Sequence, residues 1–391
     1  MEKNPMTENE QKKVLIIEPN AYHNEVIPGF VDYFLQMGYR VDCLMHQDSS
    51  KLGDVFCRCP ALKEKIRVYT FDGVHAADRI AELKRENGYT LLFFNSFEIK
   101  NNVCREAVER AEPLFENEQG MMACIHMLHM SETERSARAR YFKNRMVALS
   151  ATKISYGVAE EVNPNFFCDT EPKRALHEPV TFISVGRSQN QNELLRAADR
   201  IYKKSGKAPR LVFVRKQENW KDALLHLVKF AVIEVFRLKM LDSSLHRPLG
   251  RIDPKVKNNA EVTGRVSFAE LYDRVEAADF IVMNFYQGCE QETGGYQSGK
   301  NTFTSTQTSG SKQLSLGFLI PCIVEKKAAD YYGFSEKNAV IYEDGQLEEA
   351  LERASRMSAE EYADMVAELK KLQGDIRARS LSNLERMLRE A

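Results

Sequence analysis

The densest group of small hydroxyl residues lies in "TFTSTQTSGSKQLSLGFLIPCIVEK", residues 302–326. Six serines and threonines precede Gly310, and an apolar pattern with helical spacing follows over residues 314–319. A helix start carries unpaired N–H groups and a partial positive charge, and Ser309, Gly310 and Ser311 would add hydroxyl groups and an unhindered backbone. One serine or threonine would suffice as a plain cap. We therefore interpret this stretch as a diphosphate-binding helix start, with capping as the alternative.

Polar residues also follow the apolar runs of the first half of the chain. His126 comes directly after "MMACI", and Glu98 follows "TLLFFNSF". A lone histidine is more often structural, but the strand end and the nearby His129 make a functional role the alternative interpretation. No carboxylate or cysteine completes a metal-ligand set around these histidines, so no metal site is predicted.

Two further turns contain candidate ligand-binding residues. Asn20 and His23 follow "VLIIEP", where a helix cap is the alternative interpretation, and the glycines there do not form a dinucleotide fingerprint. Arg187 follows "VTFISVG", and a guanidinium beside a glycine is a good clamp for phosphate oxygens, with a plain surface arginine as the alternative. Glu290 and Glu292 lie in a long polar loop, and long loops inside a compact domain are often functional.

The composition restricts the class of protein. With 55 basic and 56 acidic residues among 391, the chain has no overall basic field, so no nucleic-acid partner is expected. The eight cysteines are scattered without metal-type pairs, which favours reduced thiols in the cytoplasm. No apolar stretch is long enough to span a membrane.

The elements that must position these residues form two α/β units. Apolar runs such as "RVDCLMH" and "RLVFVRK" alternate with helical patterns, which predicts doubly wound parallel sheets covered on both faces. The stretch 157–179 contains three prolines and is interpreted as a linker. Ligands of such sheets bind at the carboxyl ends of the strands.

The expected division follows from this pattern. We expect an N-terminal Rossmann-like domain over 1–165, a linker over 166–179, a C-terminal Rossmann-like domain over 180–357 and charged helices over 358–391.

Several motifs of the second half resemble those of a known family. The quoted helix "SGSKQLSLGFLIPCIV", the segment "VTGRVSFAELYDRVEAADFIVMN", the strand "VTFISVGR" and the later "NAVIYEDGQLEEAL" are similar to segments of GT-B glycosyltransferases, in particular the retaining branch that uses nucleotide sugars. The resemblance covers nearly the whole chain and implies a fold of two Rossmann-like domains that face a cleft.

The resemblance also implies roles for individual residues. The C-terminal domain would bind the nucleotide diphosphate sugar, with the helix start and Arg187 on the diphosphate, and the N-terminal domain would bind the acceptor. His126 matches a histidine that touches the donor sugar, and the last helices would cross back to the N-terminal domain. Glu98 and His126 are the geometric candidates for the acceptor base. The donor is a substrate, and neither a cofactor nor a metal is implied.

Two departures leave the donor and the stereochemistry open. Retaining members often carry two glutamates eight positions apart, but Ser298 and Lys300 stand eight positions after Glu290 and Glu292. The lysine expected a turn beyond Arg187 is replaced by Gln and Asn. The Ser-Gly-Ser element also resembles that of cytidine-diphosphate polyol-phosphate transferases, another GT-B group.

The expected function is a cytoplasmic glycosyltransferase that moves a hexosyl-type sugar from a nucleotide diphosphate donor to an acceptor hydroxyl. The acceptor would be a carbohydrate, a lipid-linked molecule or a protein, in bacterial surface polysaccharide or glycoconjugate synthesis. Two alternatives stay open: a catalytically silent subunit that supports a partner enzyme, which the missing glutamate pair motivates, and a nucleotide-sugar epimerase of the same architecture.

One apolar helical segment, residues 220–240, is too charged to cross a bilayer. It is interpreted as a helix that packs on the C-terminal sheet. The alternative is an interfacial helix that contacts the inner face of the membrane peripherally, with Trp220 and basic residues at the headgroups.

Overall fold

The protein is described by a computed structural model. The residues that it describes are 12–20, 23–72, 75–97, 102–115, 120–126, 140–142, 145–149, 159–165, 172, 175–186, 191–214, 252–264, 266–283, 310–343 and 345–389.

A seven-stranded parallel sheet forms the N-terminal unit, in the order β3-β2-β1-β4-β5-β6-β7. Its strands are β1 (Lys13–Glu18), β2 (Arg40–His46), β3 (Arg67–Phe71), β4 (Leu91–Phe94), β5 (Gly120–Ile125), β6 (Met146–Ala148) and β7 (Ala159–Glu161). The helical segments between them are η1 (Asn24–Val26), α1 (Ile27–Gln36), η2 (Gln47–Leu52), α2 (Pro60–Lys63), α3 (Ala76–Asn87), α4 (Asn102–Ala111) and η3 (Glu112–Phe115).

Both faces of this sheet are covered, as its apolar strands require. Successive residues of β1 point to opposite faces: Val14 and Ile16 join one core cluster with α1, and Leu15 and Ile17 join the other with α3 and α4. Because β1, β4 and β5 are neighbours in the parallel sheet, their carboxyl ends lie side by side.

A second parallel sheet forms the C-terminal unit, in the order β10-β9-β8-β11-β12-β13. Its strands are β8 (Thr181–Val185), β9 (Arg210–Val214), β10 (Ala260–Thr263), β11 (Phe280–Val282), β12 (Cys322–Glu325) and β13 (Ala339–Tyr342). Its helices are α6 (Gln191–Ser205), α8 (Pro254–Asn258), α9 (Phe268–Glu276), α11 (Gly310–Phe318), α12 (Lys326–Tyr332), α13 (Leu347–Ser355) and α14 (Ala359–Arg389).

The two sheets confirm the predicted fold class. The proline-containing stretch 157–179 is not a linker over its whole length, because its beginning contributes β7, which pairs with β6 at the edge of the first sheet. The expected division, with a linker over 166–179, leaves this strand in the N-terminal unit. The strand is only three residues long and has no alternating pattern that would distinguish it from a loop. We propose that the boundary between the units lies within 166–179, after β7 and before β8.

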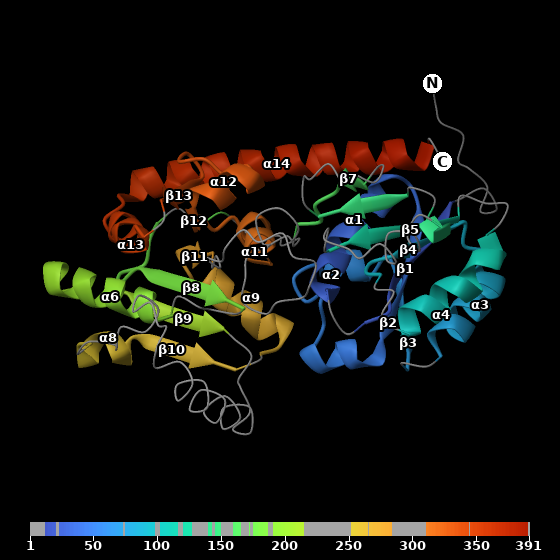
Figure 1. Ribbon diagram of the computed structural model, residues 1–391, viewed down its shortest axis with the longest axis horizontal. Coiled ribbons are helices and arrows are strands. Elements are labelled where there is room, and N and C mark those ends of the chain that lie inside the picture. Colours follow the sequence, from blue (N-terminus) through green and yellow to red (C-terminus); the bar gives the residue numbers. More distant parts are fainter. Residues whose placement is uncertain are drawn as a thin grey trace, which may run out of the picture.

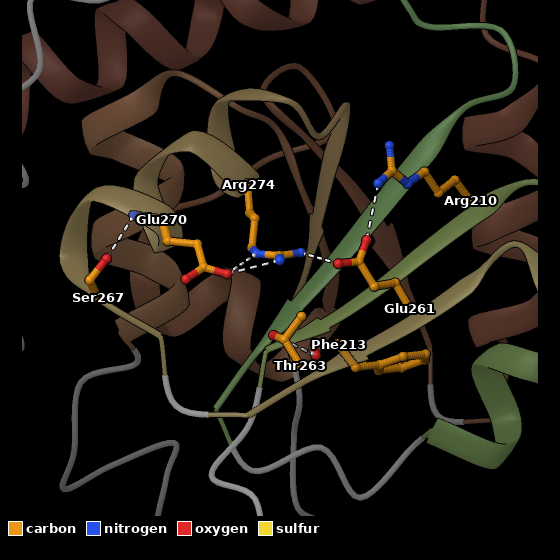
Figure 2. A network of polar contacts seen from close by, with 7 residues as sticks. All are labelled: Arg210, Phe213, Glu261, Thr263, Ser267, Glu270 and Arg274. Carbon is orange, nitrogen blue, oxygen red and sulfur yellow. Dashed lines mark hydrogen bonds and ion pairs between the residues drawn. The ribbon is translucent and has the colours of Figure 1, made fainter.

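Polar contacts fix helix α9 to the outer strands of the second sheet (Figure 2). Arg274 of α9 forms ion pairs with Glu270 of its own helix and with Glu261 of β10, and Glu261 also binds Arg210 of β9. Ser267 caps the helix by accepting a hydrogen bond from the Glu270 N–H at 3.2 Å. On its other side α9 contacts the N-terminal unit, since Arg58 pairs with Asp273 and Glu276.

The long last helix, α14, runs across both units (Figure 1). Near its start the Tyr362 hydroxyl donates to the Asp279 carbonyl beside β11, and further along Gln373 donates to the Leu316 carbonyl of α11. One turn later the contacts change to the N-terminal unit, where Arg377 pairs with Asp32 of α1 at 2.7 Å. Helix α14 thus ties the two units together.

None of the helices in the described part of the chain combines the length and the apolar character that a bilayer crossing requires. Residues 220–240, for which a packed or interfacial helix was predicted, lie outside the described residues.

Candidate functional site

A buried carboxylate lies at the carboxyl end of β1. Glu18 is fully buried and accepts three hydrogen bonds: from the Ser96 hydroxyl at 2.6 Å, from the Asn95 side-chain amide at 2.6 Å and from the Asn20 N–H at 2.9 Å. These donors come from the ends of β1 and β4, which are neighbours in the sheet. Glu18 therefore joins the two strand ends on which the polar residues stand.

The side chain of Asn95 connects this carboxylate with the next turn. Its amide nitrogen donates to Glu18 Oε2 at 2.6 Å and to the His23 carbonyl at 3.0 Å, which uses both of its hydrogens. A rotated amide would place the oxygen of Asn95 against two acceptors. The hydrogen-bond network therefore fixes the orientation of this amide.

Two histidines stack on each other above this network. The rings of His23 and His126 have centroids 3.9 Å apart and an interplanar angle of 19°. His126, after β5, contacts the Asn95 carbonyl oxygen through Nε2 at 2.7 Å. Because a carbonyl oxygen only accepts, Nε2 carries the proton, and a neutral His126 has its lone pair on Nδ1.

The backbone of His23 adopts a conformation that is unusual for a residue with a side chain. Its φ is 59° and its ψ is 20°, which is left-handed helical geometry. The residue comes directly before η1 and α1, and its Nδ1 lies 3.7 Å from a Glu25 carboxylate oxygen. Strained non-glycine residues of this kind concentrate at binding and catalytic sites.

The charges in this cluster favour proton exchange near neutral pH. Burial raises the pKa of Glu18 to about 7, although its hydrogen bonds and the nearby His23 act in the opposite direction. Two protonated imidazoles at stacking distance would repel each other, so the histidine pair favours one positive charge over two. The cluster can accept or release a proton in the pH range in which hydroxyl groups are activated by general bases.

The start of α11 forms a second polar region, on the C-terminal unit. Gly310 is exposed and a Cβ added to it would meet nothing within 4 Å, whereas the helix residues from Ser311 to Phe318 are buried. Lys312 is 2% exposed, and its ammonium lies 5.1 Å from the centroid of the Tyr332 ring. Burial lowers the pKa of Lys312 to about 8.

One short segment after β7 contacts both helix starts. The Lys312 ammonium donates to Asn163 Oδ1 at 3.4 Å, and the Tyr33 hydroxyl of α1 donates to the Asn163 carbonyl at 2.6 Å. At Gly29, a Cβ would lie 2.6 Å from Cβ of Pro164. The beginnings of α1 and α11 therefore meet at residues 163–165, although they belong to different sheets.

The structure brings part of the predicted site together. Asn20, His23 and His126 lie in one cluster, and Gly310 and Ser311 form the start of α11 as expected. The remaining candidates lie outside the described residues: Glu98, Arg187, Glu290, Glu292 and Ser309.

Glu18 was missed by sequence reasoning, together with the bridging role of Asn95. The available signal was a carboxylate directly after the apolar residues 14–17, in the last position of a strand whose two buried faces leave little water to solvate it. The described residues contain no group of three or more histidine, cysteine, aspartate or glutamate side chains placed to hold a metal ion.

Several solved structures are similar to this fold. No protein family model and no curated protein matches the sequence. The structure is similar to that of Anabaena Alr3699/HepE in complex with UDP and glucose, with a TM-score of 0.56 and 11% identity over 96% of this chain and 100% of that chain. It is also similar to an alpha-glucosyltransferase in complex with UDP-glucose and DNA containing an abasic site, with a TM-score of 0.53 and 11% identity over 95% and 94% of the two chains.

A third similar structure comes from a different class of enzyme. A UDP-N-acetylglucosamine 2-epimerase has a TM-score of 0.51 and 10% identity over 91% of this chain and 90% of its own. At these identities the likeness concerns the fold. The chain has the two-domain GT-B fold that these nucleotide-sugar enzymes share.

Proposed function

We propose that the protein is a glycosyltransferase that moves a hexosyl group from a nucleotide diphosphate sugar to an acceptor hydroxyl. The observation that carries the proposal is the pairing of two regions within this fold. An acid–base cluster lies at strand ends of the N-terminal sheet, and the start of α11 meets the N-terminal unit at Asn163. The first suits activation of an acceptor hydroxyl, and the second suits an anionic leaving group.

The donor would bind with its diphosphate at the start of α11. The exposed Gly310 leaves the backbone N–H groups approachable, and the helix dipole and Arg187 would stabilise the charge that develops on the departing diphosphate. On this proposal the reaction needs no divalent metal. Turnover that survives chelation with EDTA would support that part, and turnover abolished by EDTA and restored by Mg²⁺ would contradict it.

The acceptor would bind at the N-terminal sheet, with the histidine pair close to its hydroxyl. His126 is the proposed base, because its neutral form carries a lone pair on Nδ1. Glu98 stays a candidate from the sequence alone. The acceptor class remains a carbohydrate, a lipid-linked molecule or a protein, in synthesis of a bacterial surface polysaccharide or glycoconjugate.

The direct test is binding of nucleotides to the purified protein. UDP, GDP, ADP and CDP are compared in a thermal-shift assay, since a ligand at about 100 times its dissociation constant stabilises the folded state by about 2.7 kcal/mol. Gly310→Val should abolish the shift, because the valine side chain would block approach to the helix start while the open space around Gly310 keeps the fold intact. Gly374→Val, at an equally open helical position, is the matched control.

The outcomes separate the proposal from its alternatives. A shift that Gly310→Val leaves unchanged would show that the start of α11 is only a capped helix. Arg187→Ala should weaken the same binding by about 1.5–3 kcal/mol, as expected for a charge-assisted hydrogen bond. No shift with any of the nucleotides would favour the silent partner subunit.

A nucleotide-sugar epimerase is the second candidate, favoured by the fold shared with the epimerase. The two reactions differ in what they release. A transferase or its slow hydrolysis side reaction frees UDP from UDP-glucose or UDP-N-acetylglucosamine. An epimerase changes the sugar while it stays attached to the nucleotide, and ¹H NMR of the anomeric region distinguishes the two.

We also propose that the protein works in the cytoplasm, with contact between residues 220–240 and the inner face of the membrane as the alternative to a packed helix. This contact would bring it to a lipid-linked acceptor. Flotation with anionic liposomes at low salt tests the contact, and protein that stays at the bottom of the gradient would argue for an ordinary packed helix.

A further inference from the structure

The carboxylate of Glu18 is buried beneath the candidate site. Because the side chain is fully buried, it cannot touch a substrate in this arrangement. Its contacts among the described residues instead run to the two strand ends and the turn that hold the histidines. Any influence on the chemistry must therefore pass through those neighbours.

We propose that Glu18 is a positioning residue that, through the side chain of Asn95, holds His23 against His126, whose ring contacts the backbone carbonyl of residue 95. This inference rests on the proposed acid–base role of the two histidines. It assigns Glu18 and Asn95 to the site as groups that orient the base without contacting substrate.

The Asn95 amide is the connecting element because it has a defined direction. One hydrogen binds Glu18 Oε2 and the other binds the His23 carbonyl, while its oxygen is buried without a hydrogen-bond partner among the described residues. A buried oxygen without a partner costs free energy. When Glu18 is ionised, its carboxylate accepts and does not donate, so a rotated amide would lose both bonds.

Both histidines depend on residue 95. Its side chain holds the backbone of His23, whose left-handed conformation needs support from its surroundings. Its carbonyl oxygen accepts from His126 Nε2 at 2.7 Å, which sets the tautomer of that ring. A single residue at the end of β4 thus determines where one ring stands and which nitrogen of the other carries the proton.

The charge of Glu18 acts in the same direction as the geometry. Among the described residues, His23 is the titratable group that acts on Glu18, and each favours the charged form of the other. The stacked partner ring opposes a second positive charge. Ionised Glu18 therefore favours one imidazolium in the pair and leaves the second ring neutral and able to act as a base.

Glu18→Gln tests the direction of the hydrogen bonds at nearly constant shape. The glutamine either presents its amide nitrogen to the amide nitrogen of Asn95, so that two donors face each other, or presents it to the donors Ser96 and Asn20. In both cases the network loses a bond, but Asn95 loses its fixed orientation only in the first, because in the second the glutamine carbonyl still accepts from the Asn95 amide. Asn95→Leu, with a side chain of similar shape and no polar atoms, removes the same connection and leaves Glu18 in place.

The measurement is NMR of the histidine rings, which needs no substrate. In the wild type we expect His126 as a single neutral tautomer with its proton on Nε2, and His23 shifts displaced by the ring current of its neighbour. Asn95→Leu should reduce the displacement, because leucine cannot donate to the His23 carbonyl, while the backbone carbonyl of residue 95 still accepts from His126 Nε2. Glu18→Gln should lower the titration midpoint of His23, because a nearby negative charge is gone.

Asp42→Asn is the matched control. Asp42 is 2% exposed and accepts hydrogen bonds from the Tyr89 hydroxyl and the Arg67 N–H, but it pairs with Leu15, three positions before Glu18 along β1. This variant should destabilise the fold and leave the histidine signals unchanged. His23 shifts in Asn95→Leu, or a His23 titration midpoint in Glu18→Gln, that match those of Asp42→Asn would overturn the proposal and leave Glu18 with a structural role.

A double variant separates the connection from simple packing. When Glu18→Gln is combined with Asn95→Asp, a donor again faces an acceptor between the two side chains, but the carboxylate introduced by the second substitution cannot donate to the His23 carbonyl. We expect the ring-current displacement of His23 to stay reduced and stability to recover only in part, because the new carboxylate faces the His23 carbonyl oxygen in a buried position. Recovery of both would contradict the role of the bond to His23. Because these readouts are independent of donor binding, a failure of the glycosyltransferase proposal would leave them interpretable.

Discussion

The contact between Gly29 and the segment after β7 gives the sharpest stability prediction. Gly29 is the third residue of α1, and a Cβ built there would lie 2.6 Å from Pro164 Cβ, 2.8 Å from Pro164 Cα and 3.0 Å from the Asn165 carbonyl oxygen. Carbon atoms in contact are normally about 3.5–4.0 Å apart. Since two of these three neighbours are backbone atoms, the segment or the helix must move to admit a methyl group.

The magnitude follows from two opposing contributions. Alanine gains about 1 kcal/mol over glycine in a helix interior. Overpacking costs about 3 kcal/mol at the upper end of its usual range, which a contact with backbone calls for. Gly29→Ala should therefore lower the free energy of unfolding by about 2 kcal/mol, and it should displace the segment that both helix starts share.

Gly374→Ala supplies the control within the same protein. Gly374 lies inside α14, and a Cβ there would meet nothing within 4 Å. Only the helix propensity changes, so the free energy of unfolding should rise by about 0.5–1 kcal/mol. The two glycines thus predict effects of opposite sign from the same substitution.

Urea unfolding measures both. With an m value of about 3 kcal/mol per molar, the midpoint of Gly29→Ala should fall by about 0.7 M and that of Gly374→Ala should rise by about 0.2–0.3 M. A midpoint for Gly29→Ala equal to or above that of the wild type would refute the close contact between α1 and residues 164–165.

Three further predictions concern charged groups. The pKa of Glu18 is raised from 4.5 to about 7, so the folded state binds this proton more tightly than the unfolded state. The stability of the wild type relative to Glu18→Gln should therefore fall by up to about 3 kcal/mol as the pH rises from about 4.5 to 7. Parallel pH profiles of the two proteins in denaturant unfolding would contradict this. The pKa of Lys312 is lowered from 10.5 to about 8, so the folded state binds this proton less tightly than the unfolded state. The stability of the wild type relative to Lys312→Met should therefore rise by up to about 3 kcal/mol between about pH 8 and 10.5. At pH 7 the variant should be at least as stable as the wild type. Arg58→Ala removes ion pairs with Asp273 and Glu276 that are partly exposed, so it should cost less than about 1 kcal/mol, and less still at 1 M salt; a loss of several kcal/mol would mean that these pairs carry the contact between the units.

The predictability of the fold from sequence depended on the length of each signal. The segment "RVDCLMH" forms β2 over the same seven residues, Arg40–His46, because four of its five inner residues are apolar and the buried Asp42 accepts hydrogen bonds from Tyr89 and the Arg67 N–H. β6 and β7 have three residues each, too few to show any periodicity, and only the pairing of β6 with β5 and of β7 with β6 makes them strands.

The sequence indicated where the residues of the candidate site lie, but not how they contact one another. Strand ends indicated where His23 and His126 would lie, because parallel strands bring their carboxyl ends to one edge. Their stacking depends on the left-handed backbone of His23, for which a histidine gives no specific signal. Leu319 is a similar case, since it ends α11 with a φ of 54° where glycine is the usual residue, and its burial offsets the strain.

The change of partner along α14 determines how the two units can move. Gln373 is bonded to α11 and Arg377 to α1, so the helix passes from one body to the other within a single turn, and Gly374 lies in that turn. Rotation of one sheet against the other must bend the helix there, with everything beyond it acting as a lever arm. The arm from Gly374 to Arg389 is about 22 Å long at 1.5 Å per residue, so a bend of about 10° would carry its tip by about 4 Å. A movement that closes the junction of α1 and α11 would therefore produce a larger displacement at the C-terminal end of α14.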